Sequence, residues 1–146
     1  MNNNQTFLSK SKNTTYKLGY EFASKLVVPS IVSFNGELGA GKSILIRGIL
    51  NGLGVKEIIP SPTFTIVNEY KLLYPIYHFD LYRINNPFEL YEIGFEEYIY
   101  SNGISLIEWG NKASELLPKN CLTINIKIEE KNIRRITIME DKLKKI

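Results

Sequence analysis

Eight residues in the first third of the chain combine three glycines with a lysine and a serine. Gly36 to Ser43 reads GELGAGKS and fits the pattern G-x-x-x-x-G-K-[ST]. In such a loop the glycines let backbone N–H groups turn inward around phosphate oxygens, and the following helix directs its positive end to the same place. Lys42 would neutralise phosphate charge, and the Ser43 hydroxyl would coordinate Mg²⁺. The alternative is a glycine-rich strand-to-helix turn without a ligand. The candidate phosphate-binding residues are Gly36, Glu37, Leu38, Gly39, Ala40, Gly41, Lys42 and Ser43.

The sequence also bears on which nucleotide such a loop would hold. Guanine-binding proteins of this class carry N-K-x-D after a late strand. Here the corresponding stretch reads NKAS, with Ser114 in the place of the aspartate, so the carboxylate contact to guanine is missing. The sequence therefore favours ATP over GTP.

Two acidic residues follow apolar runs and are candidates for the hydrolytic machinery. Glu108 ends ISLIE, as in a Walker B element, and Asp80 ends IYHFD. Hydrolysis requires an acid at a neighbouring strand end, to hold Mg²⁺ or to orient water. Ligands of open α/β sheets gather at the carboxyl ends of strands, so both acids are expected near the γ-phosphate. The alternative for each is an ordinary acid at the end of a strand.

Four further residues have both a functional and a structural interpretation. Thr63 in SPTF is either a switch threonine that reaches Mg²⁺ or the γ-phosphate, or a surface hydroxyl in a Pro-fixed turn. His78, the sole histidine, is interpreted as a structural residue rather than a catalytic base. Trp109 is either core or a nucleotide sensor. Arg83 is either a solvated residue at a helix start or a phosphate-sensing cation.

The elements that must position these residues are predicted from periodicity and turn residues. We expect a helix over 13–27 capped by Asn13 or Thr14, and a helix over 42–54. Strands are expected over 30–36 and from Phe64 through Asn68, and two further strands are expected to end at Asp80 and at Glu108. A closing hairpin is expected over 121–128 and 134–139, with its turn at 129–132. Two short helices broken at Gly94 and a short helix over 111–117 complete the prediction.

This alternation of strands and helices predicts an α/β fold. Its expected form is a P-loop NTPase-like three-layer sandwich with a mixed, mostly parallel central sheet and a C-terminal antiparallel hairpin. The 146 residues are expected to form a single domain over 1–146.

Composition excludes several other classes of protein. A hydrophobic content of 44% suits a globular chain rather than a disordered one. The single cysteine, Cys121, rules out an internal disulfide framework and a cysteine-based zinc site. No apolar run approaches membrane-spanning length and no apolar signal core opens the sequence, so we expect a cytoplasmic protein without a membrane contact. The net charge of +3 is too small to argue for or against nucleic acid.

Four motifs in this order, GELGAGKS, SPTFTIVNEY, YHFDLYR and LIEWG, resemble a known family in a chain this short. They are similar to those of the bacterial tRNA threonylcarbamoyladenosine biosynthesis ATPases, TsaE (YjeE). The resemblance runs from the first predicted helix to the short helix after Trp109, and the tail after Pro118 matches only in pattern.

The resemblance implies a small P-loop ATPase whose ATP cycle supports repeated turnover by a partner complex. That partner is a threonylcarbamoyl-transferase heterodimer of TsaB and TsaD type proteins, which modifies the adenosine next to the anticodon of ANN-reading tRNAs. Direct or only indirect contact with tRNA stays open. The family often has Thr where this chain has Ser43, whose hydroxyl can serve the same purpose.

Carried over position by position, the family roles fall on named residues. Ser43 and Glu108 hold Mg²⁺, and Asp80 with Thr63 is needed for hydrolysis, which is expected to be slow in the isolated chain. Ser11, Thr15 and Arg134 match family positions near the nucleotide base.

Two other functions compete with this interpretation. A small-molecule kinase would use the same loop, but such kinases usually carry an arginine-rich lid, and no such segment stands between Gly54 and Asn86. A nucleotide-gated, non-catalytic adaptor would share the same residues as a slow ATPase.

Overall fold

The computed structural model describes residues 4–140 of the chain as strands and helices that alternate along the sequence. The strands are β1 (Gln5–Ser9), β2 (Ser30–Asn35), β3 (Val67–Lys71), β4 (Pro75–Asp80), β5 (Ile104–Glu108), β6 (Leu122–Glu130) and β7 (Ile133–Met139). The helices are α1 (Lys12–Phe22), α2 (Lys42–Gly52), α3 (Phe88–Glu92) and α4 (Phe95–Ile99), with 3-10 turns η1 (Ala23–Lys25) and η2 (Gly110–Ala113).

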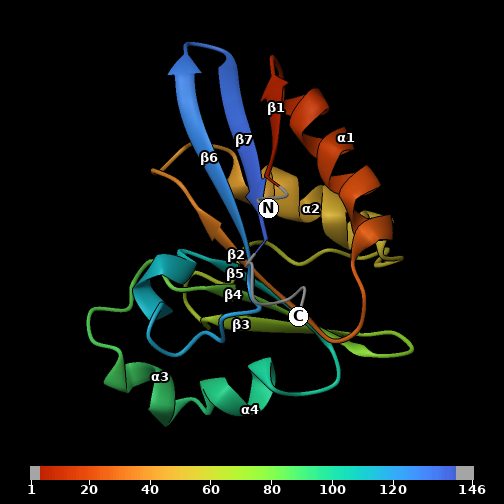
Figure 1. The fold of residues 1–146 in the computed structure, drawn as a ribbon. Coiled ribbons are helices and arrows are strands. Elements are labelled where there is room, and N and C mark those ends of the chain that lie inside the picture. Colours follow the sequence, from red (N-terminus) through yellow and green to blue (C-terminus); the bar gives the residue numbers. More distant parts are fainter. Residues whose placement is uncertain (1–3, 141–146) are drawn as a thin grey trace.

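All seven strands belong to one mixed sheet in the order β1-β7-β6-β2-β5-β4-β3 (Figure 1). The four central strands, β6, β2, β5 and β4, are parallel to one another. β3 is antiparallel to β4 at one edge, and β7 and β1 extend the other edge in antiparallel fashion. The predicted α/β class, the mixed sheet and the C-terminal hairpin are confirmed.

Helices cover the sheet on both faces, which gives the predicted three layers. Figure 1 shows α1 and α2 on one side and α3 and α4 on the other. Successive side chains of a strand point to opposite faces. Accordingly, Leu106 of β5 belongs to the core cluster under α2, and the next residue, Ile107, belongs to the cluster under α3 and α4. In the second cluster Phe79 and Phe95 pack edge to face, with ring centroids 5.0 Å apart.

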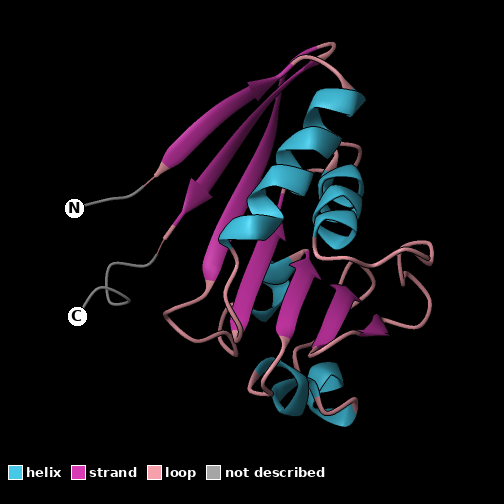
Figure 2. Ribbon diagram, turned by 90° about the vertical axis from the view of Figure 1, so that its right-hand side faces the viewer, coloured by secondary structure: helices cyan, strands magenta, loops and turns pink. Residues whose placement is uncertain are grey.

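The backbones of α1 and α2 approach each other closely (Figure 2). A Cβ added to Gly48 would lie 2.1 Å from the carbonyl oxygen of Tyr16 on α1. A Cβ added to Gly19 would lie 2.2 Å from the carbonyl oxygen of Leu45 on α2. Both distances are far below contact between real atoms, so these two positions require glycine. The close fit attaches α1 firmly to the helix that follows the glycine loop.

The first helix differs in its boundaries from the prediction of 13–27. Its N-cap is Ser11, whose hydroxyl accepts a hydrogen bond from the backbone N–H of Thr14 at 3.0 Å. The predicted caps, Asn13 and Thr14, are therefore wrong. The α-helix ends at Phe22 and continues as the 3-10 turn η1.

Two strands depart from the prediction. β1 was not predicted. It consists mostly of exposed and polar residues, and its position depends on pairing with β7, whose residues lie 125 or more positions later in the sequence. The strand expected from Phe64 begins only at Val67, because Ile66 has a φ of 72° that interrupts the extended backbone.

Two smaller elements also differ. The helix expected over 111–117 is the 3-10 turn η2 followed by irregular turns. The hairpin turn is shorter than 129–132, since Glu130 still pairs with Ile133. The break between α3 and α4 at Gly94 is confirmed, and this glycine has a φ of 73°.

Candidate functional site

The glycine loop joins the end of β2 to the start of α2, as the motif requires. Its last glycine, Gly41, occupies the N-cap position of α2 with a φ of 110°, a left-handed backbone that favours glycine. No side chain caps α2. The first N–H groups of this 11-residue helix are therefore directed at the cavity above the loop, where an anion would be stabilised.

Lys42 is folded back over its own loop. Its side chain is almost fully buried, and Nζ donates hydrogen bonds to the carbonyl oxygens of Gly36 and Glu37. Nζ also lies 4.1 Å from the centroid of the Trp109 ring. Burial lowers the pKa of Lys42, and the negative charges of Glu108, Asp80 and Glu37 oppose that shift. The ammonium group is thus held in a poorly solvated place where a further anion would bind strongly.

The two candidate acids are neighbours across the sheet. Asp80 and Glu108 are register partners at the carboxyl ends of the parallel strands β4 and β5. They are only 7% and 5% exposed. Two buried carboxylates side by side repel one another unless cations or donors compensate them. The arrangement therefore has the chemistry of a site for a hard cation.

Hydroxyl groups of the loop between α2 and β3 reach these carboxylates. Ser61 Oγ lies 2.9 Å from Glu108 Oε2 and 3.1 Å from Asp80 Oδ2. Thr63 Oγ1 donates to Asp80 Oδ2 at 3.1 Å. The backbone N–H of Tyr82 donates to Asp80 Oδ1. Ser61 was missed in the sequence reasoning, although it stands two residues before Thr63 in the SPTF motif that was singled out.

His78 also touches the acidic pair. Its Nε2 lies 2.7 Å from Glu108 Oε2, and both side chains are buried. His78 and Asp80 stand two positions apart on β4 and so share a face by alternation, but nothing in the sequence pairs His78 with Glu108. That contact joins two strands whose register only the folded sheet fixes.

A cavity of about 420 Å³ collects most of the predicted phosphate and catalytic residues. Its lining consists of Lys12, Leu38, Gly39, Gly41, Lys42, Ser43, Ile44, Thr63, Asp80, Tyr82, Glu108 and Trp109. Gly36 and Glu37 stand outside this lining and contribute their carbonyl oxygens to Lys42 instead.

A second cavity, of about 550 Å³, holds the residues expected near the base. Ser11, Thr15, Ala40 and Arg134 are among the residues that line it, and it shares Lys12, Gly39, Gly41 and Ile44 with the first cavity. The two cavities are therefore adjacent across the glycine loop. Arg134 of β7 donates from Nε to the carbonyl oxygen of Ala40 at 3.1 Å, which joins the C-terminal hairpin to that loop.

Two other residues considered in the sequence take definite positions. The Trp109 backbone is left-handed, with a φ of 61°, and its ring lines the first cavity. The Arg83 guanidinium carbon lies 4.6 Å from the centroid of the Phe64 ring and the side chain is outside the cavity lining.

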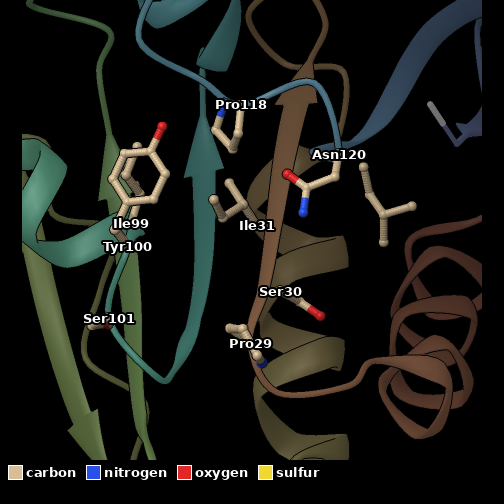
Figure 3. A pocket seen from close by; sticks show the side chains of 9 residues that line it. Pro29, Ser30, Ile31, Ile99, Tyr100, Ser101, Pro118 and Asn120 are labelled. Carbon is tan, nitrogen blue, oxygen red and sulfur yellow. The ribbon is translucent and has the colours of Figure 1, made fainter. Parts of the chain in front are cut away.

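A third hollow, of about 150 Å³, lies at the opposite end of the sheet (Figure 3). Figure 3 shows it between the start of β2, the end of α4 and the segment around Pro118 and Asn120. Its lining contains no charged residue: Pro29, Ser30, Ile31, Ile99, Tyr100, Ser101, Pro118, Asn120 and Leu122. It therefore lacks the cations that a phosphate site requires.

Two absences within residues 4–140 limit what else this part of the chain offers. None of the helices there combines the length and the apolar character needed to cross a membrane. That part of the chain also holds no group of three or more His, Cys, Asp or Glu side chains able to bind a metal by themselves. A cation at the Asp80–Glu108 pair would thus need further ligands from hydroxyls, water or phosphate, as is usual for Mg²⁺.

Known proteins resemble this chain over nearly all of its length. The model of the family described as "Threonylcarbamoyl adenosine biosynthesis protein TsaE" matches residues 9–136. A Treponema pallidum protein named tRNA threonylcarbamoyladenosine biosynthesis protein TsaE is 34% identical over 131 residues, which cover 90% of this chain and 97% of that protein. A Rickettsia bellii protein of the same name is 39% identical over 141 residues, covering 94% and 96%.

A solved structure agrees with these matches. The crystal structure of Bacillus subtilis YdiB superposes with a TM-score of 0.83 and 29% identity, covering 99% of this chain and 90% of that one. The resemblance drawn from the four motifs is confirmed, and the chain belongs to the TsaE family of tRNA threonylcarbamoyladenosine biosynthesis proteins.

Proposed function

We propose that the chain is a slow, Mg²⁺-dependent ATPase that supports threonylcarbamoyladenosine modification of ANN-reading tRNAs. One observation carries the enzymatic part of this proposal. The buried Lys42 ammonium, the Asp80–Glu108 carboxylate pair and the Ser43 and Thr63 hydroxyls line a single cavity at the start of α2. Such a set can compensate both a polyphosphate and a divalent cation.

The phosphate-binding part of the site uses the loop from Gly36 to Ser43. Its backbone N–H groups and the N-terminus of α2 would bind the phosphate oxygens, and Lys42 would exchange its carbonyl and aromatic contacts for phosphate oxygens. The adjoining cavity lined by Ser11, Thr15 and Arg134 would receive the base. Its position next to Ala40 supports a ligand that spans both cavities.

The oxygen donors fit Mg²⁺. Ser43 and Glu108 would hold it, because a hydroxyl and a carboxylate are hard ligands. When bound, the cation would neutralise charge on the phosphates. Asp80 would orient the attacking water, and Thr63, which already donates to Asp80, would position that carboxylate.

The expected partner is a threonylcarbamoyl-transferase heterodimer of TsaB and TsaD type proteins, and the work on tRNA would take place in the cytoplasm. The names of the relatives support the pathway. The composition of the site also supports the need for a partner. Among the residues that line the first cavity Lys12 and Lys42 are the only cations. This lining therefore contains no arginine that could stabilise charge in the transition state. An arginine supplied in trans is worth about 10³–10⁵ in related NTPases.

The test is phosphate release by the purified chain, with and without the heterodimer, together with threonylcarbamoyl-tRNA formation over many turnovers. We expect slow hydrolysis alone, a marked rise with the heterodimer, and tRNA modification that stops after few turnovers when this chain is omitted. Absence of hydrolysis in the complete mixture would favour the non-catalytic adaptor. A phosphorylated metabolite among added candidates would favour the kinase.

A further inference from the structure

We propose that His78 is a positioning residue that holds the Glu108 carboxylate in the orientation in which it binds Mg²⁺. This inference rests on the proposed function, since it assigns a role within the same site. It gives the sole histidine of the chain a task that packing alone does not explain.

The first support is the geometry of the pair. His78 Nε2 and Glu108 Oε2 are 2.7 Å apart, and the two residues are 3% and 5% exposed. A carboxylate oxygen only accepts hydrogen bonds, so an unprotonated nitrogen at this distance would repel it. Nε2 therefore carries the proton and donates it. The bond fixes one oxygen of Glu108 against β4 and leaves the other oxygen, Oε1, for a ligand.

The second support is the difference between the two donors to that oxygen. Glu108 Oε2 also accepts from Ser61 Oγ at 2.9 Å. Ser61 lies on the segment between α2 and β3, which has neither helix nor strand at that point, and its hydroxyl is shared with Asp80. His78 instead projects from a strand that is hydrogen-bonded to neighbours on both sides. If the Ser61 segment moves when nucleotide binds, His78 still holds Glu108.

The third support is the other nitrogen of the ring. His78 Nδ1 is buried and, within residues 4–140, is the one buried side-chain nitrogen or oxygen without a hydrogen-bond partner. A histidine retained for structure would be expected to satisfy both nitrogens, because an unpaired buried polar atom is costly. The chain tolerates this cost while keeping the Nε2 contact, which indicates that the contact to Glu108 is what the histidine provides.

Partners that orient a metal ligand usually affect metal affinity by about 10–100-fold. The carboxylate of Glu108 has two oxygens and a rotatable side chain, so loss of the His78 bond would let it turn away from the cation. The expected defect is in the dependence on Mg²⁺, with the affinity for metal-free nucleotide preserved.

The first experiment uses the unaltered chain. Because there is one histidine, ¹⁵N-histidine labelling gives the NMR signals of a single imidazole. In the nucleotide-free protein we expect the proton on Nε2. A non-hydrolysable ATP analogue added with Mg²⁺ should change the imidazole signals. The same analogue added with EDTA should change them much less. A proton found only on Nδ1, or equal changes with Mg²⁺ and with EDTA, would overturn the proposal.

The second experiment compares His78→Met, which removes the donor, with His78→Gln, which restores an N–H near the position of Nε2. Ser105→Ala, at a buried polar position of the neighbouring strand β5, is the control. Calorimetry with the ATP analogue, in Mg²⁺ and in EDTA, gives the Mg²⁺-dependent gain in affinity. We expect His78→Met to lose at least about 10-fold of that gain, His78→Gln to retain it within about 3-fold, and all affinities in EDTA to match the wild type.

The outcomes separate this inference from the function it rests on. A wild-type chain that binds no ATP analogue with Mg²⁺ would overturn the proposed function and this role with it. A wild-type chain that binds the analogue, while His78→Met keeps the full Mg²⁺-dependent gain, would overturn this role alone. If His78→Met does not fold, the NMR experiment on the wild-type chain decides.

Discussion

The two adjoining cavities are built in opposite ways. The first cavity, proposed to bind the phosphates and called the phosphate cavity below, takes most of its groups from one loop of eight residues and from two strand ends in register. Its Lys42, Asp80 and Glu108 side chains are buried. The second cavity, proposed to receive the base and called the base cavity below, takes its groups from α1, from the glycine loop and from the far hairpin, with Arg134 lying 94 residues after Ala40. Two hydroxyls at the base end are already engaged: Ser11 caps α1, and Thr15 bonds to Ser9 at 2.7 Å.

We therefore expect the first cavity to provide most of the affinity for the nucleotide and the second cavity to position the base. Buried charge is strong and costly to leave uncompensated, so the phosphate cavity should supply most of the binding energy and all of the chemistry. The base cavity has neutral hydroxyls, two exposed lysines, Lys10 and Lys12, whose charges are well solvated, and one arginine in use at the loop, so it should contribute small increments. Each prediction below tests one part of that expectation.

The largest effect is expected for Lys42→Ala. Removal of one partner of a buried, hydrogen-bonded charge pair costs about 2–5 kcal/mol, so ATP affinity should fall at least about 30-fold and turnover should be lost. Calorimetry with ATP and a phosphate-release assay measure the two effects. Lys25→Ala, at an exposed position of η1, is the control. Unchanged ATP affinity in Lys42→Ala would end the assignment of the glycine loop to phosphate.

The two acids of the phosphate cavity should divide into different roles. Asp80→Asn should keep ATP affinity and lower turnover by about 10²–10⁴, the usual contribution of a group that handles the proton of the attacking water. Glu108→Gln should raise the Mg²⁺ concentration needed for half-maximal turnover. Steady-state rates across a Mg²⁺ series separate these effects, with Glu92→Gln on α3 as a surface control. Wild-type turnover in both variants would refute a catalytic role at these strand ends.

A modest effect is expected at the base end. Arg134→Ala removes one hydrogen bond to the glycine loop, a net contribution of about 1 kcal/mol, so ATP affinity should fall about 5-fold. ADP affinity should fall by the same factor, because the loss is independent of the γ-phosphate. Arg135→Ala, whose side chain pairs with Glu129 instead, is the matched control. A loss confined to ATP would mean that Arg134 acts on the phosphates and that the two cavities are less distinct than proposed.

The smallest effect is spectroscopic. Lys42 Nζ lies over the ring of Trp109, the sole tryptophan, and we expect the ammonium to leave the ring when phosphates bind. Trp109 emission should therefore change on addition of ATP with Mg²⁺, and adenosine alone should leave it nearly unchanged. A titration in a fluorimeter checks both. Equal responses to adenosine and ATP would show that the ring reports the base end.

Residue patterns alone offered candidates for the phosphate end of the site and none for the base end, for a physical reason. A glycine loop binds through its own backbone, so its residues are contiguous and their spacing is visible. Asp80 and Glu108 were found because each ends an apolar run. The contacts of Ser61 and His78 with Glu108 were not predicted, because they depend on how β4, β5 and the preceding loop meet in space.

The fold shows the same contrast. Periodicity identified α2, and apolar runs identified β4 and β5, almost to their ends, since α2 has a buried face and the two strands are buried on both faces. β1 was missed because its residues are mostly exposed and show no buried face. It is a strand because it pairs with β7, and its own composition does not reveal that pairing. Ser11, Thr15 and Arg134 came only from resemblance to the family, and their convergence depends on that same pairing.

The close contact of α1 with α2 has a consequence for how mutational tolerance should be interpreted. Gly19 and Gly48 line neither cavity, yet any side chain there would collide with backbone carbonyl oxygens of the other helix. In a saturation-mutagenesis survey scored by growth, both positions should therefore be as intolerant as Lys42. A ranking by tolerance alone would place two scaffold glycines among the active-site residues. A second score for protein abundance would separate them, because substitutions at the glycines should lower the amount of folded protein and those at Lys42 should not.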